Sequence, residues 1–168
     1  AGIATKIIRD SLKSFGGVSR RLEFKGDLKI NDKKIKLLDD YGHHPTEISA
    51  TVEAIKSSYK NKKINMIFQP HRYSRSSILF NDFVDCLDSL DRIIILDIYS
   101  AGEQNTEGIS SYDFVNSLIK KGNKAFFAKN LKEISKILES EVKNNEILIT
   151  QGAGNIVDIS NSLLAMYK

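Results

Sequence analysis

The chain has 168 residues, 41% hydrophobic and 27% charged, which suits one domain with its own core and is too short for two complete domains. Its formal net charge of +4 favours anionic partners, but 21 acidic residues are interspersed with the basic ones, so charge alone does not indicate nucleic-acid binding. No apolar run approaches the roughly 18 residues that cross a bilayer, and the single cysteine, Cys86, excludes an internal disulfide, so we expect a cytoplasmic protein.

The first predicted element is a short helix. From about Thr5 to Phe15 the apolar residues fall on one helical face, and Gly16-Gly17 ends the pattern where a helix terminus favours glycine. Apolar residues then largely alternate from Leu22 to Ile30 and from Ile35 to Leu37, around a polar turn at 31–34. This alternation predicts two hairpin-like strands with one face in the core.

After Pro45 the pattern changes to a regular alternation of helices and strands. The predicted helices cover about 45–59, 76–90, 114–122, 131–138 and 156–166, and the predicted strands 64–68, 93–96, 125–128 and 147–149. Pro45 suits the first position of its helix, and Asn130 and Asn155 are the predicted N-caps of the last two. The fold class is therefore α/β, with a mainly parallel, Rossmann-like sheet covered by helices on both faces.

Four polar loops leave the carboxyl ends of the predicted strands, namely 39–45, 69–75, 97–103 and 150–155. Because parallel strands point the same way, these loops are expected to form one rim, which is where such folds bind ligands. All but the third lead almost directly into a helix, whose N-terminal N–H groups and dipole favour an anion. The rim holds all three histidines and both prolines of the chain.

Each candidate residue also has a structural interpretation. His44 could cap the helix that begins at Pro45, and the pair Asp39-Asp40 could accept hydrogen bonds in a turn. Arg72 and Arg75 lie at a helix entrance, which disfavours cations unless an anionic partner compensates them. Cys86 lies in an amphipathic helix with no base beside it in sequence, so we assign it a structural role.

Several common sites have no match in the sequence. There is no GxxxxGK[ST] phosphate loop and no GxGxxG after a first strand, and the GAG of 152–154 is a weak signal by itself. No HExxH or Cys/His ligand spacing supports a zinc site. From the residues alone, the sequence predicts a rim that binds an anion.

The four motifs DDYGHHPTEI (39–48), FQPHRYSR (68–75), DIYSAGE (97–103) and TQGAGNI (150–156) together resemble the C-terminal part of the Mur ligase family, specifically its UDP-N-acetylmuramate:L-alanine ligases. The resemblance covers nearly the whole chain in order and spacing. It implies that residues 1–20 are a remnant of the central ATPase domain and the hinge, and that 21–168 are the C-terminal domain. The sequence also begins without methionine, which fits a piece of a longer protein.

The resemblance implies an ATP-dependent ligase that joins L-alanine to UDP-N-acetylmuramate through an acyl phosphate in peptidoglycan synthesis. ATP and Mg²⁺ would be held mostly by the missing central domain, and this chain would contact its own N-terminal and central domains but no nucleic acid or membrane. The isolated chain is expected to be inactive. A murein tripeptide recycling ligase is the alternative within the family, and an RNA-binding or zinc-dependent module is the alternative outside it.

Site residues follow from the same resemblance. The residues expected near the nucleotide are Arg21, Asp40, Tyr41 and His43. The expected catalytic residues, which face the amino acid and the reacting carboxylate, are His44, His71, Arg72 and Arg75. The substrate-binding residues are expected to be His71, Arg72, Arg75, Gln151, Gly152 and Asn155. An arginine suits a carboxylate because its planar fork binds both oxygens. No metal ligand is expected in this chain.

Overall fold

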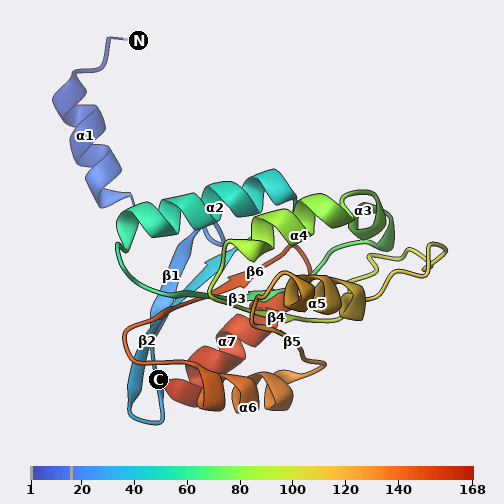
Figure 1. The fold of residues 1–168 in the computed structure, drawn as a ribbon. Helices are drawn as coiled ribbons and strands as arrows, with labels where there is room; N and C mark the ends of the chain where they lie inside the picture. Colours follow the sequence, from blue (N-terminus) through green and yellow to red (C-terminus); the bar gives the residue numbers. More distant parts are fainter. Residues whose placement is uncertain (1, 16) are drawn as a thin grey trace.

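The protein is described by a computed structural model covering residues 2–15 and 17–168. Six strands form one sheet in the order β1-β2-β6-β3-β4-β5 (Figure 1). Their bounds are Glu23–Ile30 (β1), Lys33–Asp40 (β2), Ile64–Phe68 (β3), Arg92–Ile95 (β4), Ala125–Phe127 (β5) and Ile147–Gln151 (β6). Only the β1–β2 pair is antiparallel, so the predicted mainly parallel sheet with an N-terminal hairpin is confirmed.

Helices cover both faces of this sheet (Figure 1). Their bounds are Pro45–Ser58 (α2), Tyr73–Ile78 (α3), Phe80–Asp88 (α4), Ser111–Lys120 (α5), Leu131–Glu141 (α6) and Ile156–Tyr167 (α7). Helices α2 and α4 lie on one face, and α6 and α7 lie on the other. Pro45 occupies the first turn of α2, as predicted, because its missing N–H would be unpaired there in any case.

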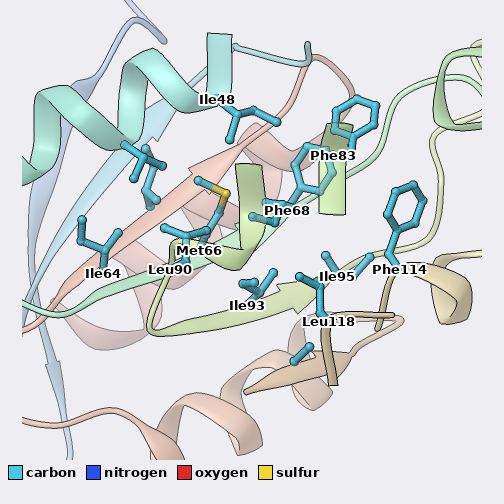
Figure 2. Close-up of a cluster of buried hydrophobic side chains, with 14 of the residues drawn as sticks. Ile48, Ile64, Met66, Phe68, Phe83, Leu90, Ile93, Ile95, Phe114 and Leu118 are labelled. Carbon is cyan, nitrogen blue, oxygen red and sulfur yellow. The ribbon is translucent and has the colours of Figure 1, made fainter. Parts of the chain in front are cut away.

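The core consists of two apolar layers separated by the sheet. Met66 and Phe68 of β3 pack into the first layer together with Phe83 of α4, whereas the intervening Ile67 packs into the second layer. Figure 2 shows the first layer, in which Phe83 and Ile48 of the covering helices meet Phe68. Strands buried on both faces are apolar without interruption, which is why the central strands were recognisable in the sequence.

The predicted single helix over 76–90 is wrong. The structure has α3 and α4 in its place, joined at Leu79, and α3 begins three residues earlier than predicted. The earlier start depends on Glu103, whose carboxylate accepts hydrogen bonds from the N–H of Ser74 at 3.0 Å and from its hydroxyl at 2.8 Å. A cap supplied from 29 residues away leaves no local signal in the sequence.

Two smaller predictions also need correction. The hairpin turn is shorter than predicted, because β2 already begins at Lys33. Asn155 is the N-cap of α7 but makes no side-chain cap, since its Oδ1 accepts from Nε2 of Gln69 at 2.8 Å. Asn130 does cap α6, accepting from the N–H of Glu133 at 3.1 Å.

Helix α1 (Thr5–Ser14) projects away from the body of the domain (Figure 1). It confirms the predicted first helix, although the part of that prediction resting on Gly16 lies outside the described residues. None of its side chains is buried, and Ile7, Leu12 and Phe15 are at least 60% exposed. Across the described part of the chain, no helix is both long and apolar enough to cross a membrane.

Candidate functional site

The ends of four strands lie in register at one edge of the sheet. Gln151 pairs with both Asp40 and Phe68, and Phe68 pairs in turn with Ile95. The loops that follow these residues therefore start side by side, which is the geometry predicted for the rim.

Four aromatic rings from three of these loops form a row along the rim. The ring centroids of Tyr41 and His43 are 5.5 Å apart, those of His43 and His71 are 5.6 Å apart, and those of His71 and Tyr99 are 5.5 Å apart. The structure thus brings together Tyr41, His43 and His71, which were predicted from the sequence. Tyr99 was missed, because a tyrosine after a strand end carries no signal of what its ring will contact.

His44 lies apart from this row. Its Nδ1 accepts from the N–H of Thr46 at 3.3 Å, so it caps α2, and its neighbours in a surface hollow include Asp82 and Cys86. The capping interpretation of His44 is confirmed. Its predicted catalytic contact is not supported by any neighbour among the described rim residues and remains a prediction.

Glu47 completes the same cap and was also missed. Its Oε2 accepts from the N–H groups of His43 at 2.8 Å and His44 at 3.1 Å, and it lies 3.6 Å from Nδ1 of His43. Burial alone would raise the pKa of Glu47, but these N–H groups and the charges of His43 and Arg21 lower it below its ordinary value. An ionised Glu47 therefore holds the histidine loop at the start of α2.

Both aspartates of the first loop are buried and fully engaged. Asp39 accepts from Oγ1 of Thr150 at 2.6 Å and from Nε of Arg20 at 3.1 Å. One oxygen of Asp40 accepts from the N–H of Leu22, and the other accepts from the N–H of Gly42 and from Nε2 of Gln151. The turn interpretation is confirmed for Asp40, which accepts from backbone N–H groups and organises the loop from inside, but not for Asp39, whose partners are side chains.

Adjacent arginines before β1 have different surroundings. Arg20 is anchored, because its Nη2 donates to the carbonyl of Gly152 at 2.6 Å while its Nε pairs with Asp39. Arg21 was the residue predicted from the sequence, yet its side chain is 54% exposed and its ion pair with Glu47 is long, at 3.9 Å. Both guanidinium groups lie over the ring of Tyr41, at 5.0 and 5.6 Å from its centroid. Arg21 is the one left free to meet a ligand.

His71 and Arg75 act as one unit. Nη1 of Arg75 lies 3.2 Å from Nδ1 of His71 and also donates to the His71 carbonyl at 3.4 Å. A guanidinium only donates, so Nδ1 is the acceptor and a neutral His71 carries its proton on Nε2. Burial, followed by the charges of Arg75, His43 and Arg72, lowers the pKa of His71 below its ordinary value. The unit presents an Nε2–H donor beside a permanent cation.

Arg72 has an unusual backbone conformation for a residue with a side chain. Its φ of 72° and ψ of 136° turn the chain sharply between His71 and α3, a geometry that costs on the order of 1–3 kcal/mol and is concentrated at functional sites. Its guanidinium is 51% exposed and 3.9 Å from Glu103. The turn places Arg72 and Arg75 on the same short segment as His71.

The loop after β6 is held by close backbone contacts. A Cβ on Gly152 would lie 2.8 Å from the Gln69 carbonyl oxygen, and the φ of Gly152 is 148°. Its N–H donates to the Asp40 carbonyl at 3.1 Å. Gln151, Gly152 and Asn155, predicted to bind substrate, therefore have partners inside the protein, and their contact with substrate remains a prediction.

Four of the five carboxylates at the rim are held by the chain itself, and the fifth, Asp97, is exposed. The carboxylates of the described rim residues Asp39, Asp40, Glu47 and Glu103 all accept hydrogen bonds from the chain itself. Arg21 and Arg72, by contrast, are more than half exposed. This arrangement suits an anion that carries phosphate or carboxylate groups.

Cys86 does not belong to this chemistry. Burial raises the pKa of its thiol to about 12, and the sulfhydryl donates to the Phe83 carbonyl at 3.2 Å. Since the thiolate is the reactive form, Cys86 is inert and has the structural role predicted for it.

Comparison with known proteins places these features in a family. Residues 20–154 match the family described as Mur ligase, glutamate ligase domain. The UDP-N-acetylmuramate–L-alanine ligase of Brachyspira hyodysenteriae is 44% identical over 160 residues, which make up 95% of this chain and 34% of that ligase. The ligase of the same name from Ruthia magnifica subsp. Calyptogena magnifica is 45% identical over 166 residues, covering 98% of this chain and 35% of that ligase.

A solved structure shows the same relationship in three dimensions. The UDP-N-acetylmuramate-alanine ligase MurC from Thermotoga maritima matches with a TM-score of 0.77 and 27% identity, covering 98% of this chain and 34% of that one. The chain thus spans about a third of the length of the relatives that it matches.

Proposed function

This chain belongs to the Mur ligase family, and on that basis we propose that it is the C-terminal domain of an ATP-dependent ligase that joins L-alanine to UDP-N-acetylmuramate in peptidoglycan synthesis. The observation that supports this most directly is the His71–Arg75 unit, which sets an Nε2–H donor beside two arginines on the rim. Such a surface fits the carboxylate of an amino acid and the charge of an acyl phosphate.

The proposed reaction needs positioning and charge stabilisation from this domain. The muramate carboxylate takes the terminal phosphoryl group of ATP, the alanine amine attacks the resulting acyl carbonyl carbon, and phosphate leaves as the amide forms. Arg72 and Arg75 would bind the alanine carboxylate, and Nε2–H of His71 would donate to an oxygen that gains charge. The two arginines and His71 would thereby orient the amine for attack.

The rim residues expected near the nucleotide suit some parts of ATP better than others. The exposed guanidinium of Arg21 over Tyr41 suits a phosphate or a purine face. Asp40 suits a ribose hydroxyl poorly, because it is only 5% exposed and both oxygens are engaged. Mg²⁺ also fits poorly, because four rim carboxylates already accept hydrogen bonds from the chain and the described residues hold no cluster of three metal-ligating side chains, so we derive no step through a metal held by this chain.

Helix α1 fits the proposed division of the chain at residue 20. Its apolar face is exposed, because Ile7, Leu12 and the following Phe15 are at least 60% exposed in the described chain. We propose that this face belongs to the central domain of the ligase, with residues up to Arg20 as the hinge. The remaining two thirds of the relatives' length would supply the surface that covers it.

The test is an assay of the full-length protein. Phosphate release from ATP should require both UDP-N-acetylmuramate and L-alanine, and the isolated 168-residue chain should show none. If the tripeptide L-alanyl-γ-D-glutamyl-meso-diaminopimelate replaced L-alanine with a higher kcat/KM, the domain would belong to a recycling ligase and the proposal would be wrong. Ligation by the isolated chain would contradict the assignment of ATP binding to the central domain.

A further inference from the structure

The loop that follows β4 fixes His71 through its backbone and its ring. The N–H of Tyr99 donates to the Pro70 carbonyl at 2.8 Å, and the Tyr99 carbonyl accepts from the N–H of Arg72 at 2.8 Å. His71 lies between these two hydrogen bonds, in an isolated parallel bridge with Tyr99. The two rings are stacked, with an interplanar angle of 15° and a centroid distance of 5.5 Å.

The ring of Tyr99 is in turn held by the loop after β6. A Cβ added to Gly154 would lie 2.8 Å from Cγ of Tyr99 and 2.5 Å from Oε1 of Gln69. The missing side chain at position 154 is therefore what allows the ring to approach. Tyr99 is wedged between two loops of the rim while remaining 40% exposed.

This contact constrains the orientation of the imidazole. Arg75 fixes one atom of the ring, Nδ1, at 3.2 Å, which leaves the plane of the ring free to tilt about that contact. A stacked neighbour removes that freedom, because an aromatic face favours an offset parallel partner. Arg75, His43, Arg72 and Glu103 are the charged and titratable groups around the ring, and the stack with Tyr99 is an uncharged contact.

We infer that Tyr99 is a positioning residue for the ligation proposed above: its ring holds the imidazole of His71 with Nδ1 toward Arg75 and with Nε2–H free to donate. The inference rests on the proposed function only for its catalytic consequence. The hydroxyl of Tyr99 has no partner among the described residues, so the planar ring is the part that acts.

The structural half of the inference is tested by NMR on the 168-residue chain, without any activity. The ¹⁵N shifts of the His71 ring should report the Nε2–H form at neutral pH in the wild type and in Tyr99→Phe. In Tyr99→Leu the imidazole of His71 loses its stacked neighbour and becomes more exposed to solvent. Its pKa should therefore rise, and both neutral tautomers should be populated. Tyr112→Leu, which removes an exposed ring packed on Phe127, is the matched control and should change nothing at His71.

The catalytic half is tested on the full-length ligase. Tyr99→Leu should lower kcat/KM for L-alanine about tenfold while KM for ATP stays within about twofold of the wild-type value, and Tyr99→Phe should keep the wild-type kcat/KM for L-alanine. If Tyr99→Leu does not fold, Tyr99→Met, which is similarly long but lacks a planar ring, takes its place. A His71 signature unchanged in the ringless variant would overturn the inference, and so would a changed signature with an unchanged kcat/KM for L-alanine. A wild type that ligates no L-alanine would instead count against the proposed function, because the NMR result does not depend on it.

Discussion

Nη2 of Arg20 donates to the carbonyl oxygen of Gly152 at 2.6 Å, across 132 residues of sequence. The same guanidinium pairs through Nε with Asp39, which is completely buried. The segment that precedes β1 is thereby tied to the ends of β2 and β6, at the centre of the rim. A residue at the edge of the domain thus sets the position of the loops that form the candidate site.

Replacing Arg20 with alanine should destabilise the domain by about 2–4 kcal/mol, because it leaves the Asp39 carboxylate buried without its cation. The lower part of that range reflects the partial exposure of Arg20, whose side chain is 19% exposed. Urea unfolding of the 168-residue chain measures the change. Arg21→Ala is the matched control, since an exposed pair at 3.9 Å is worth about 0–1 kcal/mol. Equal losses in the two variants would contradict the anchoring role of Arg20.

Gly152→Ala should cost about 2 kcal/mol or more, because the new Cβ would meet the Gln69 carbonyl oxygen at 2.8 Å on a backbone with φ of 148°. Gly122→Ala is the control that separates backbone strain from steric clash. The φ of Gly122 is 91°, but no atom lies within 4 Å of the added Cβ. The free energy of unfolding of this control should fall by only about 1 kcal/mol. Thermal unfolding of both variants compares the two costs, and a Gly152→Ala as stable as Gly122→Ala would show that the loop after β6 can move away.

Arg75→Ala in the full-length ligase should lower kcat/KM for L-alanine by about tenfold to a hundredfold, the usual worth of a hydrogen bond to a charged group. It removes both the proposed carboxylate contact and the donor to Nδ1 of His71. Arg75→Lys keeps the charge without the planar fork and should recover only part of the loss. Steady-state kinetics with varied L-alanine and saturating ATP give the measurement, and an unchanged kcat/KM would remove Arg75 from the proposed site.

Acidification should destabilise the domain in two separate ranges of pH. The folded pKa of His71 lies below its ordinary value of 6.5, so between these values the unfolded chain binds the proton more readily. The free energy of unfolding should therefore fall as the pH drops from 7 through 6.5 to the folded pKa of His71. Glu47 and Glu103 have pKa values below their ordinary value of 4.5 in the folded protein. They add a second loss of stability, which begins only as the pH falls below about 4.5.

Urea unfolding of the wild type and of His71→Asn between pH 7 and 5 isolates the first range. The free energy of unfolding of the wild type, relative to that of His71→Asn, should fall toward acid pH. Only the wild type has a histidine at this position that binds a proton more readily in the unfolded chain than in the folded protein. Arg75, His43, Arg72 and Glu103 surround the ring in the folded protein and are present in both. A difference that stayed constant across this range would mean that His71 is as readily protonated folded as unfolded.

Much of the fold could be predicted because burial leaves a periodic pattern. Continuous apolar runs such as Ile93 to Leu96 identified strands covered on both faces, and Pro45 and Asn130 marked helix starts. The early start of α3 could not be predicted, since the cap from Glu103 comes from another loop.

The sequence by itself determined that four loops would meet at one edge of the sheet, because parallel strands follow from the alternation of elements. It could not determine which side chains in those loops face inward. Arg20 and Arg21 are identical in kind and adjacent, yet one is tied to Asp39 and Gly152 and the other is exposed. Only the tertiary structure decided this, because loop side chains follow irregular backbone angles and partners more than a hundred residues away, which no local pattern records.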